Sequence, residues 1–478
     1  MDNNAQVQAV IERLERRRLD SDQPPALPIW GQLDATRFVR VDGLAAFWKE
    51  DEECRYEQYM EDLITGCHGQ GLTFAYLVLG RPNTIQVYIG MQGPQVEAIL
   101  GTALRGAFPA IELAEGAFDR VGSALNGTSL FSYLGRLTGV PTLKTARTQE
   151  REGRVQQIER LLRGLYGEEW GYLVLGRPVE QTTVVQTAYR GLEEIRLLSG
   201  MVKQNVQLSP GVTAEQTDRQ AQYGVELLEK NLQRLNRGKA QGMWQADVHL
   251  FASSEATLDK ARALCKAIYA GEESVPEPVR TFKCGGAARG NTGDQFSTLL
   301  NSHELAILAQ LPREEMPGYA VRDYARFDVA LPVEASSSPP TAAAAVNIGK
   351  VMDGATPTGN CYAVPRPDFA KHGLVVGVTG SGKTNTLFYL LEQLWNRGQG
   401  VPFLVIEPAK AEYRDLRTVP GFESLRVFTL GDERLAPFRL NPFEFEIGDV
   451  ENRIHVQTHI DYLKSVFNAA FILYAPMP

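Results

Sequence analysis

The sequence predicts an α/β protein with two parts, a set of repeated small α/β modules and a core built around a glycine-rich loop. Three observations support this prediction. The seven residues YLVLGRP occur twice, at 76–82 and 172–178. The stretch EASSSPPTAAAA at 334–345 has the composition of a linker. Beyond it, a glycine-rich loop lies between an apolar run and a helical pattern.

The composition is typical of a globular protein. Apolar residues make up 44% and charged residues 22% of the chain. Its 478 residues correspond to about three domains of ordinary size. The formal net charge of −8 means that any contact with nucleic acid would need a local basic face. With no long apolar run and no secretory signal pattern, we expect a cytoplasmic protein without a transmembrane segment.

The repeat predicts duplicated modules. Each unit is expected to contain a helix and then a strand, because the match continues upstream with a two-residue gap. The matching residues are Met60, Glu61, Leu63, Gly66 and Gly69 in the first copy and Ile158, Glu159, Leu161, Gly164 and Gly167 in the second. After the first copy, 84–91 alternates like a strand and 96–108 has a helical pattern. The Gly-Arg-Pro that ends each copy indicates a turn, with Arg81 and Arg177 in solvent. An arginine pair that binds phosphate or DNA is the alternative.

A third module is expected after a long polar helix at 213–236. Residues 243–252 should form a strand, 256–270 a helix and 279–284 a strand. The amphipathic pattern at 5–19 predicts a terminal helix, either solvated or bound to a partner. The predicted division is an N-terminal helical segment (1–55), module 1 (56–150), module 2 with the long helix (151–240), module 3 (241–332), the linker (333–345) and the core (346–478).

Two basic stretches are candidates for contact with DNA. They lie at 144–163, across the expected boundary of modules 1 and 2, and at 230–239, in module 2. Glutamates interleave with the basic residues, which favours solvated faces held by ion pairs over a nucleic acid interface.

Residues 377–384, GVTGSGKT, fit the pattern GxxxxGK[ST] at every position. An apolar run at 374–376 predicts a strand before the loop, and 385–395 predicts a helix after it. Glycines allow successive backbone N–H groups to turn toward phosphates, and the start of a helix adds partial positive charge. We therefore expect ATP binding by Gly377, Thr379, Gly380, Ser381, Gly382, Lys383, Thr384 and Asn385.

The same physics assigns roles to single residues. Lys383 is expected to reach the β- and γ-phosphates as a catalytic group, and Thr384 to place its hydroxyl on Mg²⁺. The apolar run 401–407 predicts a parallel strand that ends at Glu407, at the edge of the sheet where ligands bind. Glu412 follows shortly after it. Either carboxylate is a candidate for orienting water or contacting Mg²⁺, and ordinary loop solvation is the alternative.

The runs HGLVVGVTGSGKTNTLFYLLEQLW, VIEPAKAEY and LNPFEF resemble the HerA branch of the HerA/FtsK superfamily of P-loop ATPases. The resemblance covers 347–478. It implies a RecA-like P-loop NTPase core, ATP and Mg²⁺ as cofactors, a hexameric ring, and translocation along double-stranded DNA with a partner nuclease. In the family an acidic residue and Gly-Glu-Tyr follow the second strand. Here Glu407 and 411–413 hold those places, with Ala411 instead of glycine.

Two further hypotheses stay open. The stacked modules before the core look more like the ATPases of conjugation and type IV secretion, which implies secretion or conjugation proteins as partners. A motor of this class also needs an apolar strand ending in Asp-Glu, the Walker B strand, and none is recognisable after the loop. The resemblance thus implies a core that is incomplete at its C-terminus, with hydrolysis and the arginine finger unassigned. A nucleotide-binding scaffold or sensor is the third hypothesis.

Overall fold

A computed structural model of the chain divides into two compact units, Met1–Ala330 with Val351–Gly359, and Leu331–Lys350 with Asn360–Pro478. We describe each unit by itself. The residues that the structure describes are 3–20, 22, 24–26, 30–49, 55–114, 121, 132–144, 157–209, 212–287, 293–323, 345–353, 356–395, 400–408, 411–430, 436–444 and 456–471. Most of the predicted linker and of the first basic stretch lies outside these ranges.

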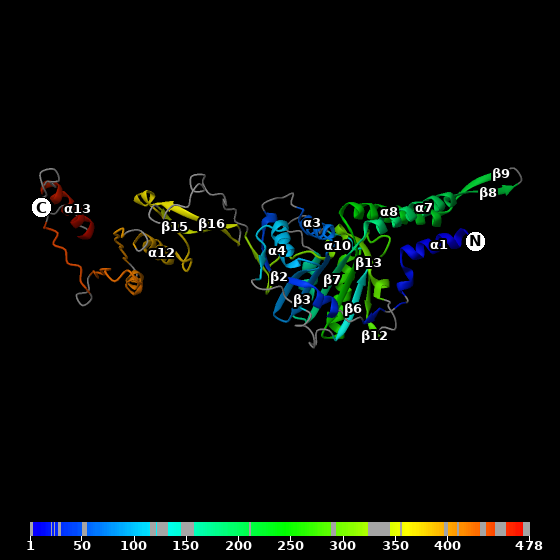
Figure 1. The fold of residues 1–478 in the computed structure, drawn as a ribbon, viewed down its shortest axis with the longest axis horizontal. Helices are drawn as coiled ribbons and strands as arrows, with labels where there is room; N and C mark the ends of the chain where they lie inside the picture. Colours follow the sequence, from blue (N-terminus) through cyan, green and yellow to red (C-terminus); the bar gives the residue numbers. More distant parts are fainter. Residues whose placement is uncertain are drawn as a thin grey trace. The chain divides into compact units, whose positions relative to one another are not determined.

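A ten-stranded sheet organises the first unit (Figure 1). Its pairs are antiparallel, except that β14 runs parallel to β2. β13 pairs with β10, and β5 with β2, beside the main path. The main path is β11 (Arg280–Lys283), β6 (Tyr133–Thr138), β10 (Met243–Ala252), β7 (Trp170–Val179), β3 (Thr73–Arg81), β4 (Thr84–Gln92), β2 (Arg37–Ala45) and β14 (Ala320–Arg322); β13 is Thr298–Asn301 and β5 is Glu112–Leu113.

Side chains alternate between the two faces of this sheet, as they must in extended strands. On one face, Tyr76, Tyr172 and Val174 belong to the larger apolar core, which also contains residues of the helices α3, α4, α6, α9 and α10. On the other face, Leu77 and Leu173 belong to a smaller apolar cluster. The helices of the unit are α1 (Asn3–Leu14), α2 (Trp30–Ala35), α3 (Tyr56–Gly69), α4 (Val96–Ala107), α6 (Gln157–Gly164), α7 (Gln181–Val202), α8 (Arg219–Gln241), α9 (Glu255–Tyr269) and α10 (Ser302–Leu308).

Short elements complete the first unit. β1 and β12 form a parallel pair, and β8 and β9 form an antiparallel hairpin between α7 and α8 (Figure 1). These elements are β1 (Pro25–Ala26), β12 (Gly285–Ala287), β8 (Lys203–Ser209) and β9 (Val212–Thr217), with the 3-10 helices η1 (Arg17–Asp20), η2 (Phe47–Lys49) and η4 (Gly293–Phe296).

The two copies of the repeat lie side by side. β3 pairs antiparallel with β7, and Leu77 stands opposite Leu173, which holds the same position in the second copy. The chain is therefore locally two-fold symmetric about this pair. The matching tyrosines follow the same symmetry, since the hydroxyls of Tyr76 and Tyr172 donate to the backbone oxygens of Gln310 and Leu308 at 2.7 and 3.0 Å.

The predicted Gly-Arg-Pro turn is confirmed only in the first copy, where β3 ends at Arg81 and β4 begins at Thr84. In the second copy the strand continues to Val179, and Arg177 donates to Asp247 at 2.9 Å instead of lying free in solvent. The glycine of the motif also has another role. A Cβ at Gly80 would lie 2.2 Å from Nε1 of Trp170, so the position needs the smallest side chain for packing.

The strands predicted for modules 1, 2 and 3 all belong to this one sheet, and the segment 1–55 contributes β2 to it. The strand at 243–252 and the helices at 96–108 and 256–270 are confirmed within a residue or two. The long helix α8 starts only at Arg219, because β9 occupies the first part of its predicted range and Asp218 caps the helix. The module boundaries themselves stay a prediction.

The terminal helix α1 is not a solvated helix. Val7 and Ile11 are buried, and they pack in a cluster with Leu198 of α7 and Leu228 of α8. The helix therefore has the apolar face that the sequence predicted, and α7 and α8 of the same chain cover that face.

The second unit contains most of β15 (Ala345–Asp353) and β16 (Thr356–Pro365), which pair in a two-stranded sheet, followed by η5 (Arg366–Ala370), α12 (Lys383–Trp395), η6 (Glu412–Thr418) and α13 (Val456–Phe471). The prediction of strands at 374–376 and 401–407 was wrong, because the structure has no strand in either segment. Parallel pairs become stable when both sheet faces are covered. Here the side chains of Leu374, Leu404 and Ile406 are 81–85% exposed.

Among the described residues, no helix has both the length and the apolar composition needed to cross a bilayer.

Candidate nucleotide-binding site

The glycine-rich loop adopts a backbone that other residues would strain. Gly380 and Gly382 have φ values of +84° and +89°, in the left-handed region that side chains with a Cβ disfavour. At Gly377 a Cβ would lie 2.3 Å from Oγ of Ser381, so the hydroxyl of Ser381 would have to move. Backbone conformation thus favours glycine at two positions of the motif, and close packing favours it at the third.

Helix α12 begins at Lys383, directly after the loop. The backbone N–H of Thr386 donates to the oxygen of Gly382 at 2.9 Å, which closes the first helical turn. Thr384 and Asn385 lie in this turn, beside the N–H groups that carry the partial positive charge of the helix. The expected order of loop and helix is confirmed, although the strand before it is not formed.

Lys383 folds back over the loop. Its Nζ donates to the backbone oxygens of Gly377 and Val378, both at 2.7 Å. The ammonium group of the motif thus lies inside the curve of backbone that the glycines create. The combination of loop, cation and helix start has the chemistry of an anion cradle.

Glu407 does not point at open solvent. Its two carboxylate oxygens accept the backbone N–H groups of Glu412 and Tyr413, at 3.1 and 3.3 Å. The segment that follows is η6, which begins at Glu412. This capping contact was missed from the sequence. The sequence held one hint of it: Ala411, the residue before η6, has no side-chain acceptor, so the first N–H groups of η6 need an acceptor from elsewhere.

Tyr413 connects η6 to the helix after the loop. Its ring packs edge-on against Phe388 of α12, with 5.1 Å between the ring centroids. Burial raises the pKa of the Tyr413 hydroxyl, and the nearby negative charges of Glu407 and Glu412 raise it further. Both predicted acidic residues are therefore close to one tyrosine that contacts α12.

A metal ion would find few protein ligands here. In the part of the chain that the structure describes, no group of three or more His, Cys, Asp or Glu side chains could hold one. A hard cation such as Mg²⁺ is commonly held by few protein ligands together with the phosphates of its nucleotide. Thr384, in the first turn of α12, suits this arrangement by residue type and place.

Residues 346–472 match the family model described as the central domain of helicase HerA. This segment belongs to the HerA/FtsK-type P-loop ATPases. The match covers the glycine-rich loop, both acidic residues and α13. No match is found among proteins of curated function.

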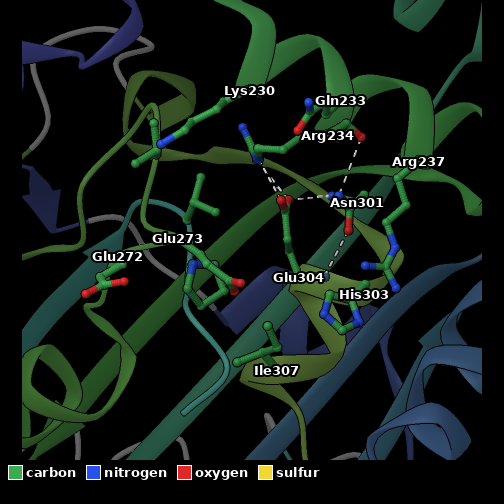
Figure 2. Close-up of a pocket in the computed structure, with 13 residues that line it drawn as sticks. Lys230, Gln233, Arg234, Arg237, Glu272, Glu273, Asn301, His303, Glu304 and Ile307 are labelled. Carbon is green, nitrogen blue, oxygen red and sulfur yellow. Dashed lines mark hydrogen bonds and ion pairs between the residues drawn. The ribbon is translucent and has the colours of Figure 1, made fainter. Parts of the chain in front are cut away.

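Outside the HerA-type segment, the first unit has a pocket of about 390 Å³ beside α8 (Figure 2). The second basic stretch contributes Lys230, Arg234 and Arg237 to its wall. Figure 2 shows Arg234 directed at Glu304, whose carboxylate it binds through Nε and Nη2 at 2.6 and 2.8 Å.

The other arginine of this wall is also held by an acidic partner. Arg237 donates to the buried carboxylate of Glu61 at 3.0 Å, and His303 bonds the same carboxylate at 2.7 Å. The expectation of a salt-bridged helix face is therefore confirmed for both arginines. These two arginines are held by carboxylates of the same unit.

Proposed function

We propose that this chain is an ATP-binding subunit of a HerA-type motor, which hydrolyses ATP and moves along double-stranded DNA. The observation that carries the proposal is the loop itself. Gly380 and Gly382 hold the left-handed backbone of a phosphate cradle, with Lys383 inside its curve and α12 starting behind it. The family match covers this segment and supports an ATPase of the same kind.

Lys383 takes the first step of this proposal. Its ammonium group exchanges two bonds to neutral backbone oxygens for bonds to negatively charged phosphate oxygens, in which both partners are ionised. The N–H groups of the loop and the start of α12 then surround the same phosphates. When bound, Mg²⁺ would neutralise developing charge on the transferred phosphate, and the hydroxyl of Thr384 would hold it.

The larger assembly is part of the same proposal. We infer a hexameric ring in which a neighbouring subunit supplies the arginine finger, with double-stranded DNA and a nuclease as partners. An alternative is an ATPase of conjugation or type IV secretion, and the large unit before the HerA-type segment supports it. Co-purification with secretion proteins rather than a nuclease distinguishes the two. ATP binding without turnover would favour a scaffold or sensor.

The test compares Lys383→Ala with Lys371→Ala. Lys371 is an exposed lysine near the loop that bonds Asp368 at 2.6 Å, and it makes a matched control. We expect Lys383→Ala to weaken binding of a fluorescent ATP analogue at least ~10-fold, because one charge-assisted contact contributes roughly 1.5–3 kcal/mol. Lys371→Ala should bind like the original protein. ATPase activity that rises with added duplex DNA supports the motor, and equal nucleotide affinity of the two variants would refute the site.

A further inference from the structure

The helix η6 begins with a residue that cannot cap it. Ala411 holds the N-cap position, with φ −134° and no side-chain acceptor. The first N–H groups of any helical segment need acceptors from outside it. Since φ is negative there, the position does not need the left-handed backbone that favours glycine.

Glu407 supplies the missing acceptors from upstream. One oxygen takes the N–H of Glu412 at 3.1 Å and the other the N–H of Tyr413 at 3.3 Å. A carboxylate that bonds two consecutive amides holds both residues in place, and rotating it toward another ligand would break these bonds. The contact joins the end of the 401–407 segment to the start of η6.

The anchored residues in turn contact the helix that follows the loop. Tyr413 packs edge-on against Phe388, one to two turns along α12 from Lys383. An edge-to-face ring pair of this kind stabilises the contact beyond the area it buries. A continuous set of contacts thus leads from Glu407 through Tyr413 to the nucleotide-binding helix.

We propose that Glu407 is a positioning residue, whose carboxylate fixes Glu412 and Tyr413 against α12, and that it is neither the catalytic base nor a Mg²⁺ ligand. The role in turnover rests on the proposed ATPase function, whereas the anchoring contact does not. The anchor holds the backbone of Glu412 and Tyr413, and its loss should slow turnover while the loop still binds ATP.

The first experiment needs no hydrolysis. Amide hydrogen exchange is measured over 411–418 in the full chain and in Glu407→Ala, Glu407→Gln and Glu423→Ala. Glu423 is the matched control, because its carboxylate also accepts a backbone N–H, that of Gly421 at 2.9 Å. We expect exchange at Glu412 and Tyr413 to accelerate about tenfold in Glu407→Ala, less in Glu407→Gln, and not at all in Glu423→Ala. Unchanged exchange in Glu407→Ala overturns the anchor.

The second experiment separates positioning from chemistry. Since the side-chain amide oxygen in the Glu407→Gln variant still accepts one N–H, kcat should fall less than ~5-fold there and about 10-fold in Glu407→Ala, with KM for ATP within about twofold. A base or a metal ligand would instead lose roughly 10²–10⁴-fold in both variants. Equal and large losses in both overturn the proposal. If the unmodified chain shows no ATPase activity, the proposed function fails, and the exchange data still decide the anchor.

Discussion

Replacing His249 tests how the centre of the sheet responds to acid. His249 lies on β10, paired with Arg136 of β6 on one side and Leu173 of β7 on the other, and it is 8% exposed. Its pKa is lowered to about 4, mainly by burial and then by the positive charges of Arg136 and Arg177, while the charge of Asp247 acts in the opposite direction. The imidazole is therefore neutral in the folded protein across the physiological range.

The sign of the effect follows from proton binding. In the unfolded chain the imidazole binds a proton near pH 6.5, and in the folded chain only near pH 4. Between these values the unfolded state binds more protons, so the free energy of unfolding decreases as the pH falls. The contribution of His249 is fully present above pH 6.5 and is lost by about pH 4. Its size is about 3 kcal/mol.

The assay compares the original protein with His249→Gln. Amide hydrogen exchange of β10 gives the free energy of opening at pH 7.5, 6 and 5. Because β10 belongs to the first unit, this measurement does not depend on the second unit. As the pH falls from 7.5 to 5, the free energy of opening should decrease by about 2 kcal/mol more in the original protein than in the variant. His372→Gln, at an exposed site, is the control and should behave like the original. Equal pH dependence in the original and His249→Gln would refute the reasoning.

Two glycine substitutions test packing and backbone strain. Gly80→Ala should lower the free energy of unfolding of the first unit by roughly 1–3 kcal/mol, because the new Cβ would collide with Trp170. Gly69→Ala is the control, since a Cβ there meets nothing within 4 Å, and thermal unfolding compares the two variants. Gly382→Ala should weaken ATP-analogue binding about tenfold through the roughly 1–2 kcal/mol cost of its left-handed backbone, and Gly373→Ala, in open space, should not. Equal behaviour within either pair contradicts the corresponding claim.

The features that could be predicted from the sequence are those that depend only on residues close together in the chain. The strand at 243–252 alternates and is rich in β-forming residues, and the structure gives it the same bounds. The glycine positions of the loop also follow from a local rule, since a left-handed backbone at Gly380 and Gly382 excludes most other residues. Such features need no knowledge of the rest of the chain.

What the sequence missed depends on contacts between distant segments. The pattern of α1 showed an apolar face but could not show that α7 and α8 cover it. The repeat showed two equal strands but not that β3 and β7 pair with each other. At the candidate site, the acidic Glu407 was recognised, yet its role as a cap depends on how the chain returns toward it.

The two YLVLGRP copies pair at the centre of the sheet as two identical subunits pair across a two-fold axis, but within one polypeptide. Each copy presents the same backbone edge to the other, with Leu77 and Leu173 on the symmetry axis. An edge strand that pairs so well with its own sequence invites pairing between molecules when it is exposed. Because β4 and β10 cover the outer sides of β3 and β7, this self-complementary edge is satisfied within the chain. Separating the halves would therefore produce fragments prone to associate with one another.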